Sequence, residues 1–332
     1  MSHRIRLGIL RLCDAAPVIF AKHKGLFAQA GLDVTLSVEP SWANIADKLT
    51  YDVLDGAVML PPLAIACSAG LRGRAVELTV PMSLSLEGDS FTLALGLQPL
   101  FLRGGMAAVV AHKHVRLAVV HGFSSHNMLL RYWLAMQGIQ PNQDVDIIVL
   151  PPAEMVGSLA AGAIDGFFAG APWGVVAETA HLGFTALLSH DIWPAHPEKC
   201  LALRSEFVLK RPEQTTSLLQ VLLRAQSACA APQSREELAA LLALPDYLGL
   251  PADLLIKALD PAQGGPIFAS PYPHVVQAQW YVRQMEYQNK KAFDLEGVAA
   301  RIYRPDLLLN TSSGDIKEVK IPDERKTILT HR

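Results

Sequence analysis

Residues 122–133 of this chain read GFSSHNMLLRYW. A run rich in β-branched residues at 115–120 comes directly before them, and Gly138 closes the helical pattern that follows. This order predicts a strand, a turn and a helix, with Ser125 as the N-cap residue and Gly138 at the C′ position. The start of such a helix offers free backbone N–H groups at the positive end of the helix dipole. His126 stands at that start, so the stretch suits a small anion.

The composition is that of an ordinary soluble globular chain. It has 332 residues, 51% hydrophobic and 18% charged, with a net charge of −2. This length is sufficient for two domains or two lobes. Because there is no basic excess, we expect no direct binding of nucleic acid or of an anionic membrane. No apolar run reaches the length that spans a membrane, so no membrane span is predicted.

The start of the chain and its cysteines bear on the compartment. The sequence opens MSHRIR and continues into a strand-like run, without a long apolar segment or a cleavage site before it. The four cysteines are scattered and lack metal-ligand spacing. Reduced, partly buried thiols fit them better than a disulfide framework. We therefore expect a cytoplasmic location, unless a leader was trimmed from the sequence.

Strand and helix patterns alternate along most of the chain, which predicts an α/β fold built on parallel sheets with helices on both faces. Two series of such units are followed by amphipathic helices. The predicted strands are 5–10, 34–38, 56–60, 76–85, 91–95, 115–120, 145–150, 164–169, 184–188 and 200–208, and the predicted helices include 16–30, 42–51, 62–69, 126–137, 218–230, 235–242, 252–259 and 274–288.

The second series of strands and helices is predicted to be a lobe inserted into the first. The boundaries are 1–95 and 200–303 for lobe 1, 96–199 for lobe 2, and 304–332 for a polar C-terminal tail. Two chain crossings between two lobes form a cleft that can close on a ligand. In such folds the ligand lies where the carboxyl ends of strands meet helix starts.

Several short motifs resemble those of a known family. They occur in one order with similar spacing, and they are DAAP at 14–17, KHKG at 22–25, SW at 41–42, DKL at 47–49, DGA at 55–57, MLPP at 59–62, RYWL at 131–134, GAPW at 170–173 and HPEK at 196–199. The chain thereby resembles the nitrate- and bicarbonate-binding branch of the type II periplasmic-binding-protein fold. That branch includes binding subunits of ABC transporters and cytoplasmic nitrate/nitrite sensors. The resemblance implies a two-lobed fold with the ligand in the cleft.

The resemblance also implies a set of ligand-binding residues. The family's pocket positions match Trp42, His126, Gly170 and Lys199 of this sequence. The chemistry agrees, because nitrate and nitrite accept hydrogen bonds but cannot donate them. A lysine supplies charge, a histidine and a backbone N–H supply directed donors, and a tryptophan supplies an N–H or a flat wall.

Two positions depart from the family's pattern and bear on which anion is bound. Asp89 stands where the family usually has Asn or Gln, and Ala171 stands where it usually has Glu. An ionised Asp89 facing the anion would repel it. The side chain could instead point away, pair with His126 or Lys199, or be protonated. We include Asp89 among the ligand-binding candidates.

Each candidate also has a purely structural interpretation. His126 could cap its helix, Lys199 could be a solvated surface residue, Trp42 could fill the core, and Gly170 could permit a tight turn. Asp14 follows the first strand and could face the cleft or cap the next helix, and capping is the expected role. The helix-start position and the family match favour ligand binding for His126.

No cofactor, metal site or enzymatic activity is predicted. The pairs His112/His114 and His190/His196 lack a third convergent ligand. No set of nucleophile, base and orienting residue is recognisable. Related two-lobe folds host a thiamin-pathway pyrimidine synthase, but its clustered cysteine motif is absent from this sequence.

The leading functional hypothesis is a cytoplasmic sensor that binds nitrate or nitrite and regulates nitrate assimilation. In the resembled family, such a sensor acts on an antiterminator response-regulator protein that binds RNA. The alternative is a substrate-binding subunit of an ABC transporter for nitrate, nitrite, cyanate or bicarbonate.

Overall fold

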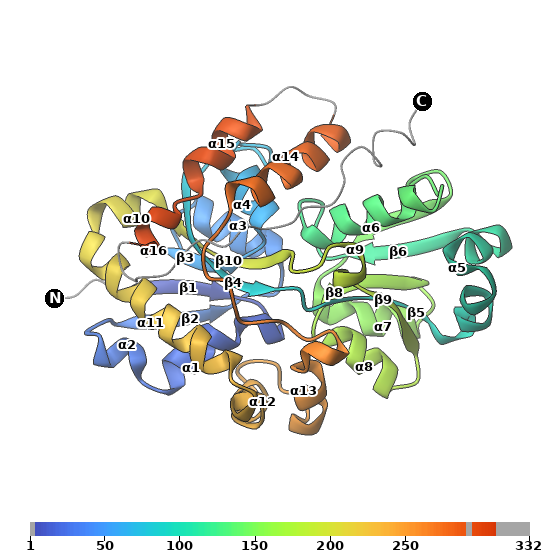
Figure 1. The fold of residues 1–332 in the computed structure, drawn as a ribbon, viewed down its shortest axis with the longest axis horizontal. Coiled ribbons are helices and arrows are strands. Elements are labelled where there is room, and N and C mark those ends of the chain that lie inside the picture. The colour runs from blue at the N-terminus through green and yellow to red at the C-terminus, as the bar shows by residue number, and fades with distance from the viewer. Residues whose placement is uncertain (1–3, 290–293, 310–332) are drawn as a thin grey trace.

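The computed structural model describes residues 4–289 and 294–309 and has two lobes side by side (Figure 1). Each lobe is built on one five-stranded sheet with helices packed around it. The α/β, two-lobed architecture is the one predicted from the sequence. Both sheets are mixed, however, whereas the alternating pattern predicted parallel sheets.

The first sheet has the order β2-β1-β3-β10-β4, with strands β1 (Ile5–Ile9), β2 (Val34–Val38), β3 (Gly56–Met59), β4 (Leu78–Leu86) and β10 (Pro197–Arg204). Strands β1, β2 and β3 are parallel, and β10 runs antiparallel to both β3 and β4. Its N-terminal helices are α1 (Ala16–His23), α2 (Leu26–Gln29), α3 (Trp42–Thr50) and α4 (Pro61–Ser68).

The second sheet has the order β7-β6-β8-β5-β9, with strands β5 (Asp89–Ala94), β6 (Val115–Val119), β7 (Val145–Val149), β8 (Gly166–Gly170) and β9 (Gly183–Leu188). Strand β5 runs antiparallel to β8 and β9. The helices of this lobe are α5 (Gln98–His112), α6 (Ser125–Met136), α7 (Met155–Ala160), α8 (Trp173–Thr179) and α9 (Ser189–Ile192).

Both chain crossings lie earlier in the sequence than the predicted boundaries at 95/96 and 199/200. Strand β5 already belongs to the second sheet and β10 to the first, so the chain crosses at Glu87–Gly88 and again just before Pro197. The backbone N–H of Glu87 donates to the carbonyl of His196 at 3.0 Å, which ties the crossings together. Gly88 has a φ of 92°, and a Cβ there would lie 2.9 Å from Pro266 Cα, so only glycine fits.

The C-terminal part is helical and packs mainly on the first lobe. Its helices are α10 (Ser205–Lys210), α11 (Pro212–Ala230), α12 (Arg235–Leu242), α13 (Ala252–Ala258), α14 (Val275–Asn289), α15 (Leu295–Ile302) and α16 (Pro305–Leu309). Helix α14 contacts α4 and α15 of the first lobe and α6 of the second, so it spans the junction (Figure 1). The expected polar tail is wrong for 305–309, which form α16; residues 310–332 lie outside the described part.

Two helices differ from the sequence prediction for backbone reasons. The expected helix at 16–30 is divided, because Gly25 adopts a left-handed φ of 65° between α1 and α2. Helix α5 was not predicted, and Gly104 and Gly105 interrupt its helical backbone.

All four cysteines are free and buried, as expected. In the part of the chain that is described, no helix is long and apolar enough to cross a membrane.

Candidate anion-binding site

The N-cap residue of helix α6 lies one position earlier in the sequence than predicted. Ser124 is the N-cap residue, and its Oγ accepts a hydrogen bond from the backbone N–H of Asn127 at 3.0 Å. The assignment of Ser125 as the cap is therefore wrong. Ser125 is the first helical residue, and its buried hydroxyl donates to the carboxylate of Glu198. Gly138 has the positive φ of 73° expected at C′.

Strand β10 carries two neighbouring charged residues into the same interior space. Residues that follow each other in a regular strand point to opposite faces. The pairing of β10 with β4 is irregular on both sides of Lys199, which lies opposite Ser85. This irregularity turns Glu198 and Lys199 inward together, and Lys199 Nζ donates to the Glu198 carboxylate. Both side chains are fully buried.

Lys199 also forms an ion pair within the first lobe. Its Nζ lies 2.9 Å from Asp14 Oδ2, and Asp14 is in the short 3-10 helix directly after β1. The expectation that Asp14 caps the next helix is wrong, because its side chain makes no capping hydrogen bond. Burial alone would lower the pKa of Lys199, but the carboxylates of Asp14, Glu198 and Asp89 raise it above its ordinary value. Lys199 is therefore charged.

Asp89 lies between two buried histidines. His126 Nε2 is 3.0 Å from Asp89 Oδ1, and His196 Nε2 is 3.5 Å from Asp89 Oδ2. Burial raises the pKa of Asp89 to about 7 and lowers the pKa of His126 to about 4 and that of His196 to about 3. Both imidazoles are therefore neutral at neutral pH. Asp89 therefore faces His126 rather than pointing away, but the two groups form no hydrogen bond among the described residues, and the raised pKa of Asp89 favours its protonated form.

Glu198 is the second carboxyl group that stays protonated above its ordinary range. Burial, together with the charge of Asp89, raises the pKa of Glu198 to about 8. A protonated carboxyl group can donate a hydrogen bond, whereas a carboxylate can only accept. Asp89 and Glu198 can therefore act as donors to an anion near neutral pH.

Trp42 and Gly170 complete the site. Lys199 Nζ lies 5.4 Å from the centroid of the Trp42 ring, so the indole is a wall of the cluster. The buried indole N–H makes no hydrogen bond within residues 4–289 and 294–309. Gly170 pairs with Asp89 between β8 and β5, and a Cβ there would lie 3.4 Å from Asp89 Oδ1 and 3.5 Å from Asp14 Oδ2. These are ordinary van der Waals distances, so Gly170 borders both carboxyl groups without being required there by space.

Comparison with known proteins places the chain in a family. The family model described as NMT1-like matches residues 2–243, which is well over half of the chain. The chain belongs to the NMT1-like family.

Individual relatives of this NMT1-like chain are named as nitrate import and nitrate/nitrite binding proteins. It is 36% identical over 300 residues to the nitrate import ATP-binding protein NrtC of Synechocystis, covering 86% of this chain and 43% of that protein. It is 34% identical over 260 residues to the nitrate/nitrite binding protein NrtA of Synechococcus elongatus, covering 73% and 58%. The chain thus spans about half the length of these relatives.

A solved structure supports the same fold. The crystal structure of the periplasmic nitrate-binding protein NrtA from Synechocystis superposes with a TM-score of 0.88 at 25% identity. The match covers 94% of this chain and 89% of that one. The NMT1-like chain therefore has the two-lobed periplasmic-binding-protein fold, as the motifs indicated.

The five predicted residues lie together, and four others join them. Trp42, Asp89, His126, Gly170 and Lys199 all border the cluster, and their roles in binding stay predictions. The four additional residues, which were not predicted for the site, are Asp14, Ser125, His196 and Glu198. Three of these residues lie in the family motifs of the sequence and could have been predicted from them. Asp14 is the first residue of the DAAP motif, and His196 and Glu198 belong to the HPEK motif.

The cluster also contains three groups that a cation could accept. One ligand atom each from Asp89, His196 and Glu198 lies within 4.8 Å of the others. The expectation that His196 has no convergent partners is therefore wrong, because its partners are these carboxyl groups rather than His190. Carboxylate and imidazole are ordinary ligands for divalent cations.

The balance of charge limits what the site can bind. Lys199 is the one ammonium among three carboxyl groups, those of Asp14, Asp89 and Glu198. With all three ionised and the histidines neutral, the cluster carries a net charge of −2. An added anion therefore requires protons on Asp89 and Glu198, protonated histidines, or a cation.

Proposed function

We propose that this chain binds nitrate or nitrite between its two lobes. The observation that carries the proposal is the buried ammonium of Lys199 beside donors without hydrogen-bond partners, the Trp42 indole and the His126 imidazole. Buried donors of this kind are costly unless an acceptor meets them. A small monovalent oxyanion supplies such acceptors, and relatives of the chain are named as nitrate/nitrite binding proteins.

Protons accompany the anion in this proposal. Nitrate cannot donate a hydrogen bond, so ionised Asp89 or Glu198 would repel it. With their pKa values raised to about 7 and 8, both groups gain protons near neutral pH and then donate to the anion. The affinity for nitrate is therefore expected to rise as the pH falls from 8 to 6.

Bicarbonate together with a divalent cation is the second candidate. Bicarbonate carries a hydroxyl group that can donate to an ionised carboxylate, which nitrate lacks. The convergence of Asp89, His196 and Glu198 favours this candidate, because these groups could hold the cation. Some relatives are named as bicarbonate transport proteins.

Calorimetric titration with nitrate, nitrite, bicarbonate and chloride tests both candidates. We expect micromolar binding of nitrate or nitrite at pH 6.5 in the presence of a chelator, lost in Lys199→Met and weakened at least tenfold in His126→Gln. Binding of bicarbonate only with added calcium would replace the first candidate by the second. Binding of neither anion would contradict both.

The proposed role is that of a cytoplasmic sensor rather than an enzyme, with an antiterminator response-regulator protein as the partner. Both lobes contribute to the cluster, and the Cys13 N–H of the first lobe donates to the Ala171 carbonyl of the second at 2.9 Å. Ligand binding is thereby coupled to the relative position of the lobes, which supports a conformational output. The alternative is the substrate-binding part of an ABC transporter, in keeping with the relatives' names.

A measurement of partner affinity separates the two roles. We would determine the Kd between the purified chain and a candidate antiterminator with and without saturating nitrate. The sensor proposal predicts at least a tenfold change. An unchanged Kd, combined with nitrate-dependent stimulation of a transporter's ATPase activity, would favour the alternative.

A further inference from the structure

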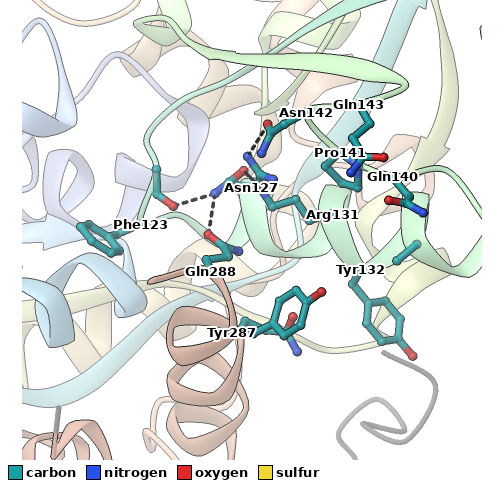
Figure 2. A pocket seen from close by; sticks show the side chains of 13 residues that line it. Phe123, Asn127, Arg131, Tyr132, Gln140, Pro141, Asn142, Gln143, Tyr287 and Gln288 are labelled. Carbon is teal, nitrogen blue, oxygen red and sulfur yellow. Dashed lines mark hydrogen bonds between the residues drawn. The ribbon is translucent and has the colours of Figure 1, made fainter. Parts of the chain in front are cut away.

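A second polar hollow lies on a different face of α6 from the cluster. It has a volume of about 560 Å³ and is bordered by α6, the loop at 140–143 and the end of α14 (Figure 2). Asn127, Arg131 and Ala135 of α6 line it, and their spacing of four residues places them on one stripe of the helix. We call this hollow the α6–α14 groove.

One positive charge, which has no carboxylate partner among residues 4–289 and 294–309, faces this groove. Arg131 is the only charged side chain among the described residues that line it. Its Nε donates to Asn127 Oδ1 at 2.9 Å and its Nη2 to Asn142 Oδ1 at 3.4 Å, so its partners are amides (Figure 2). Burial lowers the pKa of Arg131. A guanidinium in this setting is poised to pair with an anion.

The rest of the lining selects among anions. Four glutamines supply neutral groups that both donate and accept, and Tyr132 and Tyr287 supply rings; the glutamines are Gln140, Gln143, Gln284 and Gln288. A phosphate dianion would require a second cation, which the described lining does not hold. A carboxylate matches the single guanidinium, and the amides suit hydroxyl, oxo or further carboxyl groups on the same molecule.

The groove is shared between the lobes. Asn127 Nδ2 donates to Gln288 Oε1 at 3.3 Å, which joins α6 of the second lobe to α14 on the first. Asn127 directly follows His126 of the cluster. A molecule that contacts Arg131 and Gln288 together therefore holds the two lobes in the arrangement that encloses the cluster.

We propose that the α6–α14 groove binds a small organic carboxylic acid, of the size of a di- or tricarboxylate, through Arg131 and the surrounding amides. The bound acid favours the closed arrangement of the lobes and raises the affinity of the cluster for its anion. Binding in the groove does not depend on which anion the cluster holds.

Calorimetry on the full chain tests the groove directly. The probes are succinate, 2-oxoglutarate and citrate, with succinamide as the uncharged counterpart of succinate. We expect at least one acid to bind with a Kd below 1 mM and succinamide to bind at least tenfold more weakly than succinate if succinate is that acid. Failure of all three acids to bind the wild-type chain would overturn the proposal.

Variants locate the binding and separate it from the anion site. Arg131→Gln is expected to weaken the acid at least tenfold, and Gln288→Glu, which places a carboxylate in the groove, to do the same. Arg103→Gln on the exposed face of α5 removes the same charge elsewhere in the second lobe and is expected to change nothing. Equal acid binding in Arg131→Gln and wild type would also overturn the proposal.

The coupling between the groove and the cluster is measured by the effect of the acid on nitrate affinity. Saturating acid is expected to tighten nitrate binding at least threefold in the wild type and to leave it unchanged in Arg131→Gln. If the acid binds through Arg131 but no small anion binds the cluster, the groove assignment stands and the proposed function fails. If acid and nitrate both bind without affecting each other, the coupling between the sites is refuted.

Discussion

The two polar regions beside α6 hold their charge in different ways. The cluster around Lys199 is fully buried and made of ionisable groups, two of which have pKa values raised to about 7 and 8. The α6–α14 groove is open and lined by amides around Arg131. Ligand binding in the cluster must therefore be coupled to protons, whereas binding in the groove relies on a fixed charge. The first region can respond to pH and the second cannot.

The difference has an energetic basis. Charges in the cluster are stripped of water, so each must be compensated by a neighbour, a proton or a ligand. Arg131 keeps partial access to water and needs only amide oxygens to satisfy its N–H groups. Removing one charge from the cluster should accordingly cost far more than removing one from the groove.

The largest expected effect is that of Lys199→Met. This change leaves Asp14 and Glu198 without their buried cation, so we expect a loss of about 3–5 kcal/mol in the free energy of unfolding. Urea denaturation below pH 8 measures it. Lys210→Met is the matched control, because Lys210 pairs with Glu206 on the exposed surface, and it should be close to neutral. Equal stabilities for the two variants would show that the cluster is not charge-balanced as described.

The next effect is the dependence of stability on pH. Folding raises the pKa of Asp89 from 3.8 to about 7 and that of Glu198 from 4.5 to about 8. The folded state thus binds more protons than the unfolded state in this range, and stability falls as the pH rises. The buried histidines His126 and His196 oppose this fall, most strongly below pH 6.5, because the folded state binds fewer protons on them than the unfolded state. We expect a decrease of about 1–2 kcal/mol between pH 6.5 and 8 in thermal or urea unfolding.

Double replacement of the two acids checks this assignment. The variant Asp89→Asn/Glu198→Gln keeps the shapes and removes both titrations, so its stability should vary little between pH 6.5 and 8. The decrease in the free energy of unfolding between pH 6.5 and 8 should be unchanged in Arg131→Gln, because this variant alters only the groove. If the free energy of unfolding of the double variant decreased with pH as much as that of the wild type, the titrating groups would be residues other than Asp89 and Glu198.

The smallest expected effect concerns the helix that separates the two regions. Ser124→Ala removes the N-cap hydrogen bond to Asn127 and should destabilise the chain by about 1 kcal/mol. Ser125→Ala removes a contact to Glu198 instead, so it should change the pH dependence as well as the stability. Guanidinium denaturation at pH 6 and 8 distinguishes them. If only Ser125→Ala lost stability without a pH effect, Ser125 would be the structural cap after all.

Local patterns in the sequence sufficed for much of this fold. Strand 34–38 and helix 42–51 were predicted with boundaries within a residue, because a β-branched run and an amphipathic pattern are local signals. The direction of a strand is not local. The antiparallel course of β10 and of β5 depends on partners that lie far along the chain, so parallel sheets were predicted.

The same limit applies to the site. The family motifs pointed to Lys199 and His126, and both lie in the cluster. Asp14 lies 185 positions before its partner Lys199, and no spacing rule connects them. The inward turn of Glu198 depends on an irregular pairing in β10 that a strand pattern does not reveal. These contacts determine the charge of the site. The ionisation state and direction of the Asp89 side chain could therefore not be decided from the sequence.

The most direct test is the number of protons taken up when nitrate binds. Titrations at pH 8 in buffers of different ionisation enthalpy give this number, and the wild type should take up about one proton or more, falling toward zero at pH 5.5. Asp89→Asn should reduce the uptake at pH 8 and weaken the pH dependence of the Kd. This result would place a proton-coupled anion among Lys199, Asp89 and Glu198. Nitrate binding with equal affinity at pH 6 and 8 and no proton uptake would contradict the account.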